Sequence, residues 1–200
     1  MLGGLPVSGV VPVEQMVGDD EAETAMLHDM EQDARRFLSS FAWCESIEEF
    51  YFGAGIGKVF AVFFARIKPS RESVDKFLWV VVGDLPPAYL VTDDCRNPKE
   101  ALEGYLCEMG KWAGLAKEGQ SSSDVIPVNL PATPEYAKAL KSRLDALEQK
   151  MIPSLVCRLD DFEMSGFVLT APPLPLPPRA RVPPHARPYP PAPPSPRAAP

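Results

Sequence analysis

The stretches Val59–Ala65 (VFAVFFA) and Phe77–Gly83 (FLWVVVG) decide the fold of this chain. Both are rich in aromatic and β-branched residues, which favour strands. Neither stretch alternates apolar with polar residues, as a strand with one solvated face does. We therefore expect two central strands that are covered on both faces, either by helices on each side or by a second copy of the chain.

The neighbouring segments predict the rest of a sheet. Ile47–Phe52 has the composition of a strand, and Lys58–Ile67 extends the first central stretch. The run Gly53–Gly57 lies between them, and glycine tolerates the positive φ of a tight turn, so we expect a hairpin turn there. Ala88–Thr92 predicts a fourth strand, and Pro86-Pro87 before it marks a bend because proline donates no ladder hydrogen bond.

Three helices are expected outside the sheet, over residues 19–40, 97–119 and 133–153. Each has apolar side chains at three- and four-residue steps. The first opens on acidic residues, and the other two open on a capping side chain followed by proline. Val125–Leu130 contains a proline and is at best an edge strand. This order predicts an α+β fold, with a mainly antiparallel sheet of four to five strands packed with three helices.

The composition changes near residue 170. Fourteen of the 24 prolines fall within residues 171–200, which contain four arginines and no acidic residue. Such a segment cannot bury enough apolar surface to offset its ordering entropy. We therefore expect a flexible segment over residues 1–18, one α+β domain over residues 19–165, and a disordered Pro/Arg-rich tail over residues 171–200.

One motif stands out in the tail. Arg187–Pro193 (RPYPPAP) matches the RxxPxxP pattern that polyproline-binding domains recognise. A chance match is expected among so many prolines, and an unselected extension of the reading frame gives the same composition. The sequence favours an unselected extension of the reading frame, and a docking peptide is the alternative.

The charge of the chain limits its partners. Residues 1–170 carry 16 Lys/Arg against 27 Asp/Glu, a formal charge of −11. A body this acidic repels phosphate backbones, which argues against a nucleic-acid partner. It would instead suit a basic protein partner.

The sequence also predicts a cytoplasmic location. The longest apolar runs are far below the ~18 residues that a membrane-spanning helix needs, and the first 18 residues lack the basic start of a secretory signal. The four cysteines, Cys44, Cys95, Cys107 and Cys157, form no CxxC pair. We expect reduced thiols and no membrane association.

Few residues could carry chemistry. The two histidines are His28, in the first expected helix, and His185, in the tail, and neither has the neighbours of a zinc site. Gly53–Gly57 fits neither the dinucleotide-binding nor the Walker pattern. The sequence therefore assigns no catalytic, cofactor-binding or metal-binding residue and predicts no cofactor.

The acidic residues leave one alternative open. Asp84, Asp93 and Asp94 flank the expected fourth strand. If the bend brings the strand ends together, these carboxylates could hold Mg²⁺ or Ca²⁺ or form an acid–base pair. Aspartate at a turn or before a helix also satisfies backbone donors, which is the structural interpretation.

Two blocks carry a resemblance. Lys76–Asp94 (KFLWVVVGDLPPAYLVTDD) and Val125–Leu144 (VIPVNLPATPEYAKALKSRL) resemble small bacterial proteins of an uncharacterised domain family, over approximately residues 20–152. The resemblance implies a compact intracellular domain with an immunity-like or adaptor role. It supplies no catalytic residues.

Two functions follow as hypotheses. The first is a non-catalytic protein that acts by protein–protein interaction, with a basic partner or as a homodimer. The second is a small-molecule enzyme or ligand-binding domain that uses Asp84, Asp93 and Asp94, and it requires at least two of these carboxylates to share a concave site.

Overall fold

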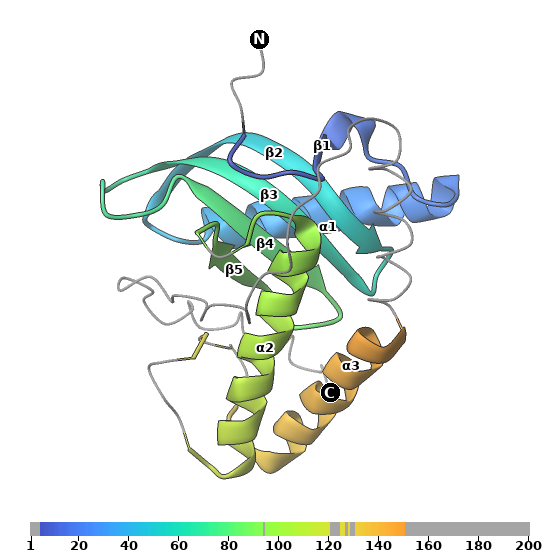
Figure 1. Ribbon diagram of the computed structural model, residues 1–200, viewed down its shortest axis with the longest axis vertical. Helices are drawn as coiled ribbons and strands as arrows, with labels where there is room; N and C mark the ends of the chain where they lie inside the picture. The colour runs from blue at the N-terminus through green and yellow to red at the C-terminus, as the bar shows by residue number, and fades with distance from the viewer. Residues whose placement is uncertain (1–4, 94, 121–124, 127, 129–130, 151–200) are drawn as a thin grey trace, which may run out of the picture.

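The computed structural model describes residues 5–93, 95–120, 125–126, 128 and 131–150 (Figure 1). In chain order the elements are β1 (Val11–Pro12), the 3-10 helix η1 (Val13–Gln15), α1 (Glu21–Ser39), β2 (Cys44–Ile56), β3 (Phe60–Pro69), β4 (Phe77–Gly83), β5 (Ala88–Val91), α2 (Pro98–Lys117) and α3 (Pro134–Lys150). The strands form one antiparallel sheet in the order β1-β2-β3-β4-β5. The predicted α+β fold is confirmed.

Helices cover both faces of this sheet: in Figure 1 α1 lies behind it and α2 in front, and α3 packs against α2. Successive residues of β3 point to opposite faces. Phe60, Val62 and Phe64 belong to the core on the α2/α3 face, whereas Ala61, Phe63 and Ala65 belong to the core on the α1 face. The expectation that both faces of the central strands are covered is confirmed, and one chain supplies both covers.

Two hydrogen bonds fix the α2/α3 face. The indole Nε1 of Trp79 on β4 donates to the carbonyl oxygen of Cys95 at 2.8 Å. The hydroxyl of Tyr105 on α2 donates to the carbonyl oxygen of Pro86 at 2.8 Å. Both side chains are fully buried. Because each ring is buried and its polar atom is also hydrogen-bonded, these two side chains hold α2 in one position on the sheet.

The predicted hairpin turn at Gly53–Gly57 is wrong in most of its length. Strand β2 continues through Gly53 and Gly55 to Ile56, and the turn occupies residues 57–59. The residue with positive φ in this turn is Lys58, at 63°. Glycine-rich sequence therefore marked the region of the hairpin but not the turn itself.

The first two glycines have another role, which is close approach between layers. A Cβ at Gly53 would lie 2.7 Å from Cγ of Pro98 at the start of α2. A Cβ at Gly55 would lie 3.0 Å from Cδ2 of Leu27 on α1. Real Cβ atoms essentially never make a contact as short as that at Gly53, and the contact at Gly55 would require its neighbours to shift, so these glycines allow α2 and α1 to pack closely on opposite faces of β2.

The ends of the sheet differ from expectation. The fifth strand is β1, where Val11 and Pro12 pair with Phe52 and Tyr51 of β2, and the sequence assigned no element before residue 19. Val13 and Met16 after it are buried in the α1-face core. Of the expected edge segment Val125–Leu130, residues 125, 126 and 128 are described, and none of these lies in a strand.

The predicted starts of α1 and α2 are confirmed. The side chain of Asp20 accepts a hydrogen bond from the backbone N–H of Glu23 at 2.7 Å. The side chain of Asn97 accepts one from the N–H of Glu100 at 2.9 Å. The stop expected at Pro153 lies outside the described residues.

Three of the four cysteines, Cys44, Cys95 and Cys107, are described, and Cys44 and Cys107 are free thiols. Burial raises the pKa of Cys44, so its reactive thiolate form is disfavoured. Cys157 lies outside the described residues. None of the helices in the described part of the chain has the length and apolar character needed to cross a bilayer.

Candidate functional site

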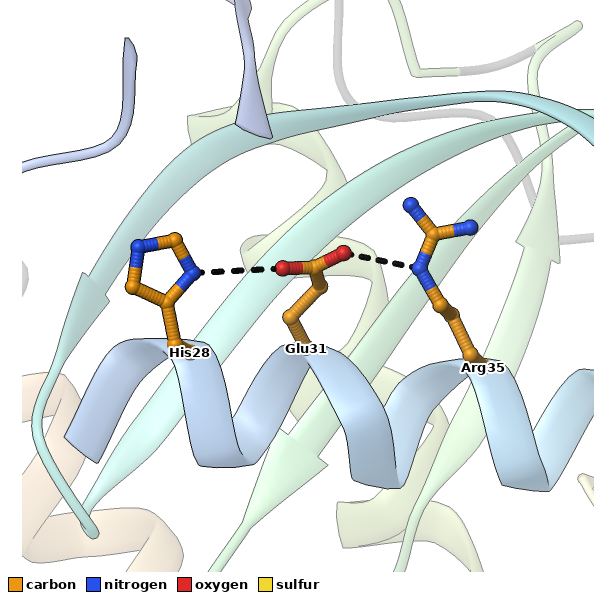
Figure 2. Close-up of polar contacts among 3 residues, drawn as sticks. All are labelled: His28, Glu31 and Arg35. Atoms are coloured by element: carbon orange, nitrogen blue, oxygen red, sulfur yellow. Dashed lines mark hydrogen bonds and ion pairs between the residues drawn. The ribbon is translucent and has the colours of Figure 1, made fainter. Parts of the chain in front are cut away.

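A row of three polar side chains on α1 is the first candidate site (Figure 2). His28, Glu31 and Arg35 are spaced three and four residues apart, so they line up on one side of the helix. Nδ1 of His28 lies 3.3 Å from Oε2 of Glu31, and Nε of Arg35 donates to Oε1 of Glu31 at 2.7 Å. Glu31 is only 6% exposed. The buried carboxylate of Glu31 therefore lies between the imidazole of His28 and the guanidinium of Arg35.

Arg35 also connects this row to the sheet. Its guanidinium carbon lies 4.5 Å from the centroid of the Phe50 ring on β2. A cation over an aromatic face contributes about 0.5–1 kcal/mol at a partly exposed site. The row thus ties α1 to β2 through Glu31, Arg35 and Phe50.

The row contains part of what acid–base catalysis needs. A buried carboxylate that holds one ring nitrogen of a histidine leaves the other nitrogen for chemistry, and the His28 side chain is 47% exposed. Among the described residues, however, the hydrogen bonds of His28 and Glu31 join them to each other and to Arg35, not to a serine or cysteine. The contacts of the row support a structural role.

The aspartates flanking β5 are not brought together. In the β4–β5 pair, Val81 lies opposite Ala88 and Leu78 opposite Val91, so Asp84 and Asp93 lie at opposite ends of the pair. The seven residues of β4 lie between these ends and separate them by about 25 Å. Asp94 lies outside the described residues. The carboxylate site that the sequence left open requires Asp84 and Asp93 to lie close together, and the pairing of β4 with β5 keeps them apart.

Each of these aspartates has a different neighbour. Asp84 forms an exposed ion pair with Arg143 on α3, at 3.4 Å. Asp93 lies near Asp75, which precedes β4, and burial together with the negative charge of Asp93 raises the pKa of Asp75. Asp84 therefore helps to hold α3, whereas Asp75 and Asp93 form a repulsive acidic pair.

The β2–β3 turn does not offer free N–H groups to an anion. The N–H of Gly57 donates to Oε1 of Glu23 at 3.2 Å, and the N–H of Lys58 donates to Sδ of Met30 at 3.3 Å. A phosphate loop needs such donors to point at the ligand. Here α1 already uses them, which supports the hairpin interpretation.

A second buried acid, which sequence analysis did not single out, lies on α2. Glu108 is 1% exposed. Its Oε1 accepts a hydrogen bond from Lys111, whereas Oε2 has no hydrogen-bond partner among the described residues. That bond raises the pKa of Lys111. Glu108 follows Tyr105 by three residues and precedes Trp112 by four, so helical spacing could have placed it on the buried stripe.

An aromatic group, likewise not expected from the sequence, lies where α1 leads into β2. We call Phe41, Trp43 and Tyr89 the aromatic corner. The ring centroids of Trp43 and Tyr89 are 5.1 Å apart, and Phe41 lies 4.9 Å from Trp43 and 5.3 Å from Tyr89. Burial raises the pKa of Tyr89 to about 12. Trp43 and Tyr89 are half-buried, unlike the fully buried Trp79.

Comparison of the chain with protein-family models, curated proteins and solved structures found no match. The resemblance of Lys76–Asp94 and Val125–Leu144 to an uncharacterised bacterial family therefore stays a prediction. The described His, Cys, Asp and Glu side chains include no group of three or more that could hold a metal ion.

Proposed function

We propose that this protein is non-catalytic and acts by binding another protein, and that its partner is basic. Immunity-like inhibition and an adaptor role are two forms that this function could take. The observation that carries the proposal is the unbalanced acidic charge on the exposed side of α1.

The charge of α1 is strongly acidic. The helix contains Glu21, Glu23, Asp29, Glu31 and Asp33 against Arg35 and Arg36, and Asp19 and Asp20 precede it. Glu31 is buried between its partners and Asp33 forms an ion pair with Arg36, whereas Asp29 is exposed one turn before Asp33 and forms no ion pair among the described residues. A surface with this excess of carboxylates speeds the association of a basic partner and favours its correct orientation.

The opposite side of the molecule lacks this imbalance. On α2 and α3 the acids Glu100, Glu103, Glu108, Glu135, Asp145 and Glu148 are offset by the bases Lys99, Lys111, Lys117, Lys138, Lys141, Arg143 and Lys150. Ion pairs between neighbouring turns, such as Lys141 with Asp145, neutralise part of this surface internally. A basic partner is therefore expected to bind on the α1 side.

The test is capture of a partner from an extract of the source organism with two charge-reversal variants. Asp29→Lys/Asp33→Lys changes the α1 side, and Glu118→Lys/Glu148→Lys gives the same change in net charge at two exposed residues, the C-cap of α2 and a residue of α3. We expect one basic protein, identified by mass spectrometry, to bind the unchanged chain and the second variant but not the first. Binding should weaken at 0.5 M salt, which screens charges beyond about 4 Å.

Equal binding by both variants, or capture that does not depend on salt, would contradict the proposal. Circular dichroism of each variant confirms that it is folded. Light scattering of the unchanged chain separately tests the predicted homodimer.

A further inference from the structure

We propose that the aromatic corner is the docking site for this chain's own Pro/Arg-rich segment, residues 171–200, which binds it in cis. The corner is defined above by Phe41, Trp43 and Tyr89, and its acidic border is formed by Asp75 and Asp93. This inference does not depend on the existence of a basic partner.

The backbone of Trp43 and the acidic border lie at one end of the sheet, and the ring of Tyr89, which pairs with Val80 in the middle of β4, contacts the ring of Trp43. Trp43 immediately precedes β2, and its carbonyl oxygen accepts a hydrogen bond from the N–H of Ser70, just after β3. Asp75 precedes β4, and Asp93 follows β5, whose last residue pairs with the start of β4. Figure 1 shows the β3–β4 loop and β5 on the left side of the view, where α1 also ends.

The rings of the corner offer the surface that polyproline segments recognise. Trp43 and Tyr89 pack at an interplanar angle of 65°, and both are half-buried. Polyproline helices dock on such aromatic surfaces because they are already extended and lose little entropy on binding. The other two tryptophans, Trp79 and Trp112, are buried and cannot serve this purpose.

The acidic border adds the charge that arginine in such a ligand needs. Asp75 and Asp93 are both exposed, and neither forms an ion pair with another described residue. Burial, and after it the negative charge of Asp93, raises the pKa of Asp75. Arg71 and Lys76 are exposed in the same loop as Asp75 and form no ion pair with it. A guanidinium placed between the two carboxylates would relieve their repulsion.

Residues 171–200 have the complementary chemistry. They contain fourteen prolines, Arg179, Arg181, Arg187 and Arg197, and no acidic residue, and they include the RxxPxxP match Arg187–Pro193. Arginine can stack on an aromatic ring and pair with a carboxylate at the same time. Aromatic rings beside carboxylates therefore fit proline and arginine together.

The connection is long enough for docking in cis. Helix α3 ends at Lys150, so residues 151–170 separate it from the docking segment. Twenty residues reach up to about 70 Å when extended. A domain of about 150 residues has a radius of gyration of only about 15 Å. The segment can reach either face of the sheet.

The experiment measures acrylamide quenching of Trp43 fluorescence in the full chain. Comparison with Trp43→Phe separates the fluorescence of the half-buried Trp43 from that of Trp79 and Trp112. We expect Trp43 to be protected in the unchanged chain. Protection should be lost in a variant whose four tail arginines are replaced by Glu, and also in Asp75→Asn/Asp93→Asn. Asp29→Asn/Asp33→Asn, which removes two carboxylates from α1, is the matched control and should keep the protection.

A second measurement tests whether residues 171–200, rather than another ligand, occupy the aromatic corner. A synthetic peptide of residues 171–200 should bind the arginine-to-glutamate variant and restore protection of Trp43. Asp75→Asn/Asp93→Asn in that variant should weaken the peptide about five- to tenfold, because each exposed charged pair contributes a factor of about two to five.

Three results would overturn the inference. The first is equal quenching of Trp43 in all variants. The second is peptide binding that the Asp29/Asp33 control weakens as much as Asp75→Asn/Asp93→Asn does, which would place the segment on α1. The third is protection that depends on protein concentration, which would assign the site to the tail of a second copy.

Discussion

The two faces of the sheet are covered in different ways. On the α2/α3 face, α2 covers the sheet and α3 packs against α2, and the large rings of Phe64, Trp79 and Tyr105 are completely buried. On the α1 face, one helix covers a core of smaller side chains around Phe63. The border of that core holds the row of His28, Glu31 and Arg35 and the half-buried aromatic corner.

This difference separates stability from recognition. The α2/α3 face has matched charges outside and large apolar side chains inside, which is what packing requires. The α1 face has acidic charge outside and half-exposed rings at its border, which are typical of binding surfaces. We therefore expect substitutions on the α2/α3 face to affect folding most, and substitutions on the α1 face to affect binding most.

The largest expected effect tests this division with two tryptophans. Trp79→Ala should lower the free energy of unfolding by about 3–5 kcal/mol, because it leaves a cavity in the larger core and removes the hydrogen bond to Cys95. Trp43→Ala, at the half-buried corner, should cost about 1–2 kcal/mol. Urea unfolding followed by circular dichroism measures both. Similar losses would show that the corner is part of the folding core.

The two buried carboxylates sharpen the comparison. Both oxygens of Glu31 have partners, so Glu31→Met should lower the free energy of unfolding by about 1–2 kcal/mol through the loss of charge-assisted hydrogen bonds. Glu108 has one oxygen without a partner among the described residues. Glu108→Met should therefore leave stability within about 1 kcal/mol or raise it, because a buried, half-satisfied charge is replaced by an apolar side chain of similar size. A larger loss at Glu108 than at Glu31 would contradict this view of the two acids.

Features that depend on local sequence could be predicted. The apolar character of Phe60–Ala65 indicated strands covered on both faces, and Asn97 followed by Pro98 indicated the start of α2. Both rest on side-chain periodicity or on backbone chemistry within a few residues. The same information gave the α+β class.

Features that depend on distant contacts could not be predicted. The need for glycine at position 53 comes from Pro98, forty-five residues later, and the aromatic corner joins Trp43 to Tyr89 across the sheet. The separation of Asp84 from Asp93 follows from the register of β4 and β5, which the sequence did not fix. Such contacts leave no periodic pattern to detect.

Alkaline pH provides a smaller test of the α1 face. The folded pKa of Tyr89, about 12, is raised above its ordinary value of 10.0 by burial. The folded state therefore disfavours the phenolate, and the resulting stability is complete below pH 10 and is lost as pH rises through 12. The loss should be on the order of 1–2 kcal/mol, reduced by the partial exposure of the ring.

Tyr89→Phe is the matched variant for this test. It keeps the ring but removes the titrating group, so its unfolding free energy should fall less steeply between pH 10 and 12 than that of the unchanged chain. Urea unfolding at each pH measures the difference. Identical slopes would mean that the hydroxyl of Tyr89 is solvated in the folded protein. Tyr51, whose pKa is also raised by burial, remains in both chains and cancels.

The smallest expected effects come from the two helix caps, which have the same geometry and different charge. Asn97→Ala and Asp20→Ala should each cost about 1 kcal/mol, because each leaves one N–H of the first helical turn without its acceptor. Asp20 also places a negative charge at the positive end of α1, a contribution that salt screens. The loss from Asp20→Ala should therefore shrink in 0.5 M salt, while that from Asn97→Ala should not change, as thermal unfolding at both salt concentrations can show. If salt changed the loss from Asn97→Ala but not the loss from Asp20→Ala, the proposed electrostatic contribution of Asp20 would be contradicted.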